Sequence, residues 1–176
     1  MNQEPREGGI PFGLSNNALK IIAMISMLLD HCGYYLFYDF EPMRAAGRLA
    51  FPIFAYMIAE GCTHTRNRLR YFSTIAGMAL VFQIVYQIVT GSLYQSILVT
   101  FSVSIILIYA LDHFREKRDL LSGVLAALTL IAAIFVSAIA PEIFFGSGFH
   151  LDYGAIGVLL PVIVYFAPDK KTKLIC

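Results

Sequence analysis

The sequence predicts an all-α fold, a polytopic transmembrane helical bundle of about six helices, from three observations. Of the 176 residues, 58% are hydrophobic and only 14% are charged, and the mean hydropathy is +0.69. A soluble domain usually carries about 25% charged residues, so this composition is typical of a membrane protein. Apolar runs of membrane-spanning length recur along the chain, and basic residues gather in alternate connectors between them.

Six apolar runs account for the predicted helices. A helix needs about 20 residues to cross roughly 30 Å of hydrocarbon. The fifth run has no charged residue, whereas the sixth is short and contains two glycines and a proline. In chain order the predicted helices are Ala18–Tyr38, Arg44–Cys62, Tyr71–Val89, Tyr94–Leu111, Leu120–Ala140 and Leu151–Phe166.

These helices are expected to form one transmembrane domain over residues 18–168, between a polar N-terminal arm (1–17) and a basic tail (169–176). The arm is too long and too acidic for the start of a signal peptide, and no small-residue cleavage site follows the first apolar run. That run is therefore expected to be retained. The three cysteines have no regular spacing, which argues against a disulfide framework or a zinc site.

The distribution of lysine and arginine predicts that both termini are cytoplasmic. Cytoplasmic connectors of membrane proteins carry an excess of basic residues. The opposite surface of this bundle holds only Arg44, beside acidic residues. Eleven of the 13 basic residues fall on one side of an even-numbered bundle: Arg6, Lys20, Arg66, Arg68, Arg70, Arg115, Lys117, Arg118, Lys170, Lys171 and Lys173.

Three ionisable residues fall at membrane depth in the predicted helices: Asp30, His31 and Arg48. Such groups cost at least ~2.5 kcal/mol each at the bilayer centre and therefore usually face a partner or a cavity. At 1.5 Å per residue, Asp30 lies roughly 18 Å above the cytoplasmic surface. The second helix descends from Arg44, so Arg48 lies about 6 Å below the outer surface and roughly 24 Å above the cytoplasmic one. The sequence therefore predicts an Asp30–Arg48 ion pair, because the gap is about one helical turn.

Two interpretations of His31 stay open. In one, the ion pair clamps two helices together and His31 is a hydrogen-bonded histidine of the bundle. In the other, His31 is a general base in a polar pocket within the membrane, because histidine exchanges a proton near neutral pH. Asp30 is poorly placed to orient His31, since neighbours i and i+1 point in different directions on a helix.

A second polar group lies at the end of the second predicted helix. Glu60, His64 and Arg68 would share one helical face if the helix continued past Gly61. With Arg66 they are expected to form a basic mouth for an anionic ligand such as a nucleotide phosphate. The alternative is a helix-end ion pair at the cytoplasmic boundary. No metal site is predicted, because Glu60 and His64 lack a third ligand nearby.

Other motifs carry less information about function. The chain has no Gly-rich phosphate loop, no Gly-x-Ser-x-Gly elbow and no nucleic-acid-binding motif, so nucleic acid is not an expected partner. Gln83 and Gln87 lie four residues apart in the third predicted helix. Buried amides at this spacing often hydrogen-bond between membrane helices, so these two are expected to hold helices together.

Four blocks of the sequence resemble the TraX family of polytopic membrane proteins. They read LKIIAMISMLLDH over residues 19–31, GRLAFPIFA over 47–55, AEGCTHTRNR over 59–68 followed by Tyr71, and DYGAIGV over 152–158. Two features differ from the family's pattern. Val85 stands where a proline is expected in the third helix, and family members generally continue through further helices beyond this length.

The resemblance implies an acyltransferase of the bacterial cytoplasmic (inner) membrane. The family is named for conjugal transfer, and its namesake acetylates the N-terminus of pilin subunits. A member is expected to use acetyl-coenzyme A as co-substrate, without a permanently bound cofactor. The expected partners are membrane lipid and a peptide or glycan acceptor.

In this hypothesis, the coenzyme A phosphates bind at the basic mouth and the pantetheine arm reaches about 15 Å to His31. His31 removes a proton from an amine or hydroxyl acceptor, while Asp30 and Arg48 hold the pocket and Arg48 stabilises the oxyanion. A non-enzymatic assembly factor or small transporter is the alternative, although the chain lacks the internal repeat common in transporters. The residues expected to bind the phosphates are Glu60, His64, Arg66 and Arg68.

The predicted topology is testable with reporter fusions. Because basic residues set the orientation, fusions after Asp39 and Pro141 should report the outside, and fusions after Arg68 and Lys117 the cytoplasm. Paired phosphatase and fluorescent-protein reporters would measure this in intact cells. A cytoplasmic signal after Pro141 would remove the fifth or the sixth helix from the topology.

Overall fold

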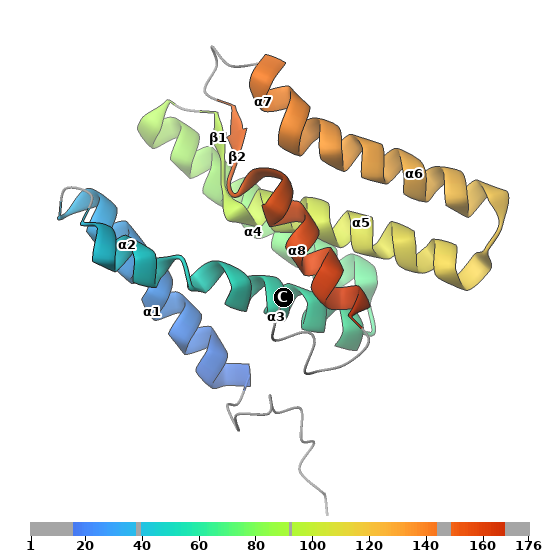
Figure 1. Ribbon diagram of the computed structural model, residues 1–176, viewed down its shortest axis with the longest axis horizontal. Helices are drawn as coiled ribbons and strands as arrows, with labels where there is room; N and C mark the ends of the chain where they lie inside the picture. The colour runs from blue at the N-terminus through green and yellow to red at the C-terminus, as the bar shows by residue number, and fades with distance from the viewer. Residues whose placement is uncertain (1–15, 38–39, 92, 144–148, 168–176) are drawn as a thin grey trace, which may run out of the picture.

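The computed structural model of the chain describes residues 16–37, 40–91, 93–143 and 149–167, and it is almost entirely helical (Figure 1). The N-terminal arm before residue 16 and the basic tail lie outside the described residues. In chain order the elements are α1 (Asn16–Tyr35), α2 (Glu41–Gly47), α3 (Ala50–His64), α4 (Arg68–Thr90), β1 (Tyr94–Gln95), α5 (Ile97–Lys117), α6 (Leu120–Ile134), the π-helix η1 (Phe135–Ile139), α7 (Ala140–Ile143), β2 (His150–Leu151) and α8 (Gly154–Phe166).

The predicted class, an all-α transmembrane bundle, is confirmed. Three helices within the described residues are long and apolar enough to cross a membrane: α4, α5 and the continuous helix Leu120–Ile143 made of α6, η1 and α7. Helix α8 is apolar but has only 13 residues. The cytoplasmic placement of both termini stays a prediction from the basic residues.

The second predicted helix, Arg44–Cys62, is wrong as a single element. It is divided into α2 and α3, and Arg48 and Leu49 lie between them. The two parts have different neighbours, because α2 packs on α1 whereas α3 packs mainly on α8. Gly47 ends α2 where the chain lies directly against α1, and this contact separates the direction of α2 from that of α3.

A short parallel strand pair also corrects the predicted helix starts. Tyr94 pairs with His150 and Gln95 with Leu151. The predicted helices at residues 94 and 151 therefore begin only at Ile97 and Gly154. Because this pair joins segments more than 50 residues apart, no local pattern in the sequence indicates it.

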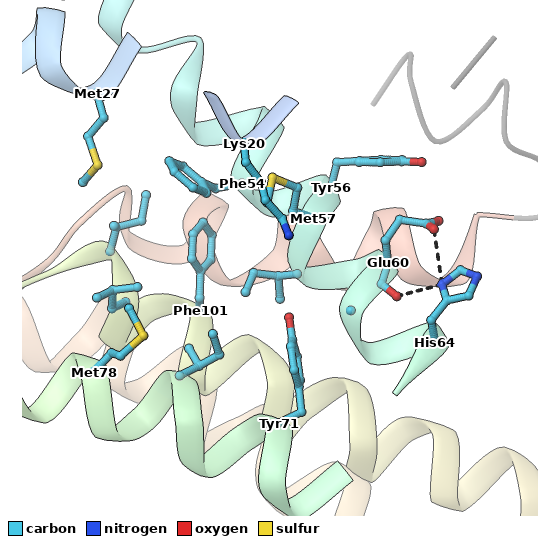
Figure 2. A pocket seen from close by; sticks show the side chains of 15 residues that line it. Lys20, Met27, Phe54, Tyr56, Met57, Glu60, His64, Tyr71, Met78 and Phe101 are labelled. Carbon is cyan, nitrogen blue, oxygen red and sulfur yellow. Dashed lines mark hydrogen bonds and ion pairs between the residues drawn. The ribbon is translucent and has the colours of Figure 1, made fainter. Parts of the chain in front are cut away.

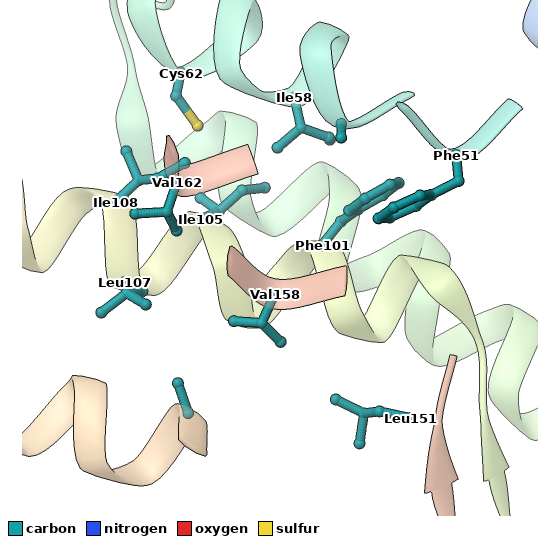
Figure 3. Packing of buried hydrophobic residues seen from close by; sticks show 12 residues of the cluster. Phe51, Ile58, Cys62, Phe101, Ile105, Leu107, Ile108, Leu151, Val158 and Val162 are labelled. Carbon is teal, nitrogen blue, oxygen red and sulfur yellow. The ribbon is translucent and has the colours of Figure 1, made fainter. Parts of the chain in front are cut away.

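Helix α5 lies at the centre of the bundle, in contact with α3, α4, α6 and α8. Its side chains Phe101, Ile105 and Ile108 are almost fully buried, and Figure 3 shows them between α3 and α8. Small polar side chains are buried on the same helix, and Ser104 donates a hydrogen bond of 2.9 Å to the Val158 carbonyl of α8. Such bonds satisfy hydroxyls where no water reaches them and hold membrane helices together.

Two glycines provide a matched test of the α1–α2 contact. A Cβ at Gly47 would lie 2.3 Å from the Asp30 Cβ and 2.6 Å from its Cα, so Gly47→Ala must push the two helices apart. We expect a loss of about 2 kcal/mol in the free energy of unfolding, as for other overpacked sites. Unfolding in mixed detergent micelles would measure it.

Gly77 in the middle of α4 is the control, because a Cβ there would meet nothing within 4 Å. Gly77→Ala should be neutral or stabilising by up to about 1 kcal/mol, since alanine favours the helix. Equal effects at the two positions would contradict the close packing of α1 on α2.

Candidate functional site

Two adjoining cavities lie along α1, α3, α4 and α5. The first, which we call the polar cavity, has a volume of about 620 Å³ and is lined by Met27, Asp30, His31, Tyr34, Arg44, Arg48, Phe82, Tyr86, Tyr94, Ser96, Ile97, Leu98, Asp152 and Tyr153. The second, the apolar cavity, has a volume of about 570 Å³ and is lined by Lys20, Met27, Phe54, Tyr56, Met57, Ile58, Glu60, Gly61, His64, Tyr71, Ile75, Met78, Ile97, Leu98 and Phe101. The linings of the two cavities share Met27, Ile97 and Leu98, so the cavities adjoin at these three apolar residues.

The polar cavity brings together the three charged residues that the sequence placed at membrane depth. Asp30 and His31 come from α1, and Arg48 comes from the link between α2 and α3. His31 and Arg48 are exposed at the cavity, and Asp30 is about a third exposed. These residues can therefore meet a ligand that enters this cavity.

The predicted ion pair between Asp30 and Arg48 is wrong in its second member. Asp30 Oδ1 lies 3.9 Å from Arg44 Nε, so Arg44 is the partner. On α2, Arg44 lies three residues before Gly47 and thus on the helix face that packs on Asp30, whereas Arg48 follows the end of the helix. The Arg44 guanidinium also lies over the Tyr34 ring, 5.1 Å from its centroid.

Asp152 is a site residue that our reasoning from the residues missed. Its carboxylate accepts a hydrogen bond of 2.8 Å from the Tyr94 hydroxyl, and its carbonyl accepts one of 3.0 Å from the Thr100 hydroxyl. Its backbone N–H donates to the Gln95 carbonyl at 3.1 Å. Asp152 lines the polar cavity together with Asp30 and His31. Asp152 is therefore a second, firmly held acid of the polar cavity.

The backbone after Asp152 explains the spacing of the DYGAIGV block. Tyr153 and Gly154 both have left-handed conformations, with φ of 58° and 51°. The Tyr153 ring stacks on Phe51, with 4.1 Å between ring centroids, which holds the strained residue in place. At Gly157 a Cβ would lie 2.8 Å from the Thr100 side chain, so only glycine lets α8 approach α5 this closely. The aspartate of that block was the sequence signal for the site.

Gln83 supports the same region, as expected of an amide that holds elements together. Its side chain donates to the Tyr94 carbonyl at 2.9 Å and accepts from the Ser96 backbone N–H at 3.3 Å. Both bonds join α4 to the segment that carries Tyr94. Gln87 is exposed.

The apolar cavity holds part of the predicted basic mouth (Figure 2). Glu60 and His64 line it together, with His64 Nδ1 3.0 Å from the Glu60 carbonyl oxygen and 3.4 Å from its carboxylate. Lys20 also lines this cavity, and its side chain extends from α1 towards Met57 in Figure 2. In the sequence, Lys20 indicates only a cytoplasmic start of the first helix, because no local pattern shows that α1 packs beside α3.

Arg66 and Arg68 do not line either cavity. The predicted helical face is confirmed for Glu60 and His64, because α3 continues past Gly61 to His64. It is wrong for Arg68, which begins α4. Arg68 instead pairs with Asp112 and, at 3.6 Å, with Glu116, so it joins α4 to α5. Asn67 interrupts the helix by capping α4, where its side chain accepts the Arg70 N–H at 2.9 Å.

The corrected ion pair predicts unequal effects at the two arginines. Arg44→Gln leaves the Asp30 carboxylate without its partner and should lower the free energy of unfolding by roughly 1–2 kcal/mol. This is less than for a fully buried pair, because both side chains are about a third exposed. Arg48→Gln, the control, should cost little. Adding Asp30→Asn to Arg44→Gln should recover part of the stability, because no unpaired carboxylate is then left. A larger loss of stability for Arg48→Gln than for Arg44→Gln would contradict the assignment.

Comparison with known proteins gives the chain a family. The model of the family described as TraX protein matches residues 15–175. A relative from Dichelobacter nodosus, named "Probable fimbrial assembly protein FimC, serogroup H1", is 29% identical over 89% of this chain and 64% of its own length. "Uncharacterized protein RP591" of Rickettsia prowazekii (strain Madrid E) is 22% identical over 89% of this chain and 57% of its own.

The chain thus spans less than two thirds of the length of these relatives. No solved structure is significantly similar to it. The family match covers both cavities and every block of sequence that resembled the family. The chain belongs to the TraX family of membrane proteins.

Proposed function

We propose that the chain is an integral membrane acyltransferase that moves an acetyl group from acetyl-coenzyme A to an amine or hydroxyl of an exported or surface acceptor such as pilin. The proposal places it in the bacterial inner membrane. The observation that carries it is the pair of cavities joined at Met27, Ile97 and Leu98. They offer a path from an end with Lys20 and His64 to the cavity that holds His31.

Charged and apolar regions follow one another along this path as the phosphates and the pantetheine arm do in coenzyme A. Phosphates would bind at the end of the apolar cavity, where Lys20 and His64 can supply positive charge and Arg66 lies nearby in sequence. Arg68 is already paired with Asp112 and Glu116, so its proposed part is to hold α4 on α5. Glu60 would keep His64 in place through their contact of 3.4 Å.

In the polar cavity, His31 would act as the general base. The acceptor nitrogen or oxygen forms a bond to the thioester carbonyl carbon, and the carbon–sulfur bond breaks. The proton of the acceptor passes by way of His31 to the departing coenzyme A sulfur. Arg48 lines the cavity and has no ion pair with a described residue, so it would stabilise the oxyanion. The pair of Asp30 and Arg44 would hold the pocket in shape.

The second candidate is a non-enzymatic membrane assembly factor, which is favoured by the name of the Dichelobacter nodosus relative. The two candidates differ in what the purified protein binds. An acyltransferase binds acetyl-coenzyme A and consumes it when amine acceptors are added. An assembly factor binds a stoichiometric membrane partner and no coenzyme A.

A pair of histidine variants tests the role of His31. His31→Gln keeps hydrogen-bonding capacity but cannot take up a proton near neutral pH, so turnover should fall by ~10²-fold or more while coenzyme A binding stays unchanged. His113→Gln is the control, because His113 lines neither cavity. Acetyl-coenzyme A consumption and equilibrium binding would be measured on the same preparations. Full turnover by His31→Gln would remove the general base from the proposal.

A further inference from the structure

The apolar cavity has a lining that suits a chain of methylene groups. Aromatic and aliphatic side chains form most of its wall. Three methionines, Met27, Met57 and Met78, line it from α1, α3 and α4. Flexible thioether side chains adapt to the shape of an apolar ligand without a fixed geometry.

A cation faces this apolar lining. Lys20 lines the cavity, and within the described residues it forms no ion pair. Glu60, the acidic residue in the lining, is in contact with His64. Figure 2 shows the Lys20 ammonium between Met57 and Tyr71, on the side of the cavity opposite to α4. An ammonium beside an apolar cavity favours a ligand that joins an anionic group to an apolar chain.

Helices α1 and α4 both line the apolar cavity but pack little on each other. Both helices contribute lining residues, but α1 packs on α2 and α3, whereas α4 packs on α5 and to a lesser extent on α3. Only 6% of the apolar 18-residue stretch of α4 is buried within the bundle, so most of this helix faces the lipid. An apolar chain can therefore reach the cavity sideways from the bilayer.

The volume of the cavity decides between a lipid chain and a partner helix. An α-helix with side chains has a diameter of about 10–12 Å. The cavity of about 570 Å³ would hold only about 5–7 Å of such a cylinder, roughly one turn. A single alkyl chain is far thinner and fits along the whole cavity.

We infer that the apolar cavity is a lipid-binding site that takes one alkyl chain of an anionic membrane lipid, admitted between α1 and α4, with its anionic group on Lys20. This goes beyond the proposed acyl transfer and does not depend on it. If both hold, a lipid chain and the coenzyme A arm compete for the same space.

The test uses the purified full chain in micelles and palmitic acid with a photoactivatable diazirine on its chain. Mass spectrometry should find the label on residues of the cavity wall. Met78→Trp fills the cavity and should lower labelling about tenfold. The matched control on the same helix is Leu80→Trp, because Leu80 is about as exposed as Met78 (62% and 54%) but does not line the cavity. This variant should label like the wild type.

The headgroup is tested with Lys20→Gln. This change should weaken binding of the fatty acid about fivefold and leave a fatty alcohol of equal chain length unaffected. Equal labelling of Met78→Trp and Leu80→Trp, or label confined to the outer face of α4, would overturn the inference. Displacement of the probe by an apolar helical peptide would also overturn it in favour of a partner helix. The labelling measures lipid binding without any acyl transfer, so it tests this inference even if the protein transfers no acetyl group.

Discussion

The contact of Gly47 with Asp30 determines how the first half of the molecule is arranged. Because a Cβ at Gly47 would overlap the Asp30 backbone, α2 can lie against α1 at this distance only with glycine there. The same contact brings Arg44 to within 3.9 Å of the Asp30 carboxylate. Helix α2 ends at Gly47, and Arg48, which follows it, lines the polar cavity.

A second close contact positions the other acid of the polar cavity. Gly157 lets α8 lie on Thr100 of α5, and the Thr100 hydroxyl then holds the Asp152 carbonyl at 3.0 Å. The Tyr94 hydroxyl fixes the Asp152 side chain at 2.8 Å. The residues around α5 thus serve two purposes, since they form the core and they hold an acid at a defined place.

The charges of the site are arranged so that each carboxylate has a compensating neighbour. Asp30 has Arg44, Asp152 has the Tyr94 hydroxyl, and Glu60 has His64. Ionisable groups at membrane depth are costly without such partners. The two cavities adjoin at Met27, Ile97 and Leu98, so apolar side chains lie between the two polar ends of the site.

The sequence by itself determined the membrane class, the approximate positions of the long helices and the presence of Asp30, His31 and Arg48 among apolar residues, because apolar runs and the charges within them are local properties. It also marked the DYGAIGV block through resemblance to the family. Only the tertiary structure decided which arginine pairs with Asp30, that Arg68 joins α4 to α5, and that Lys20 enters a cavity. These three outcomes depend on how the helices pack, which brings together segments that are distant in the sequence and which hydrophobic periodicity does not encode. The helix break at Asn67 is local, because its side chain caps α4 by accepting the Arg70 N–H.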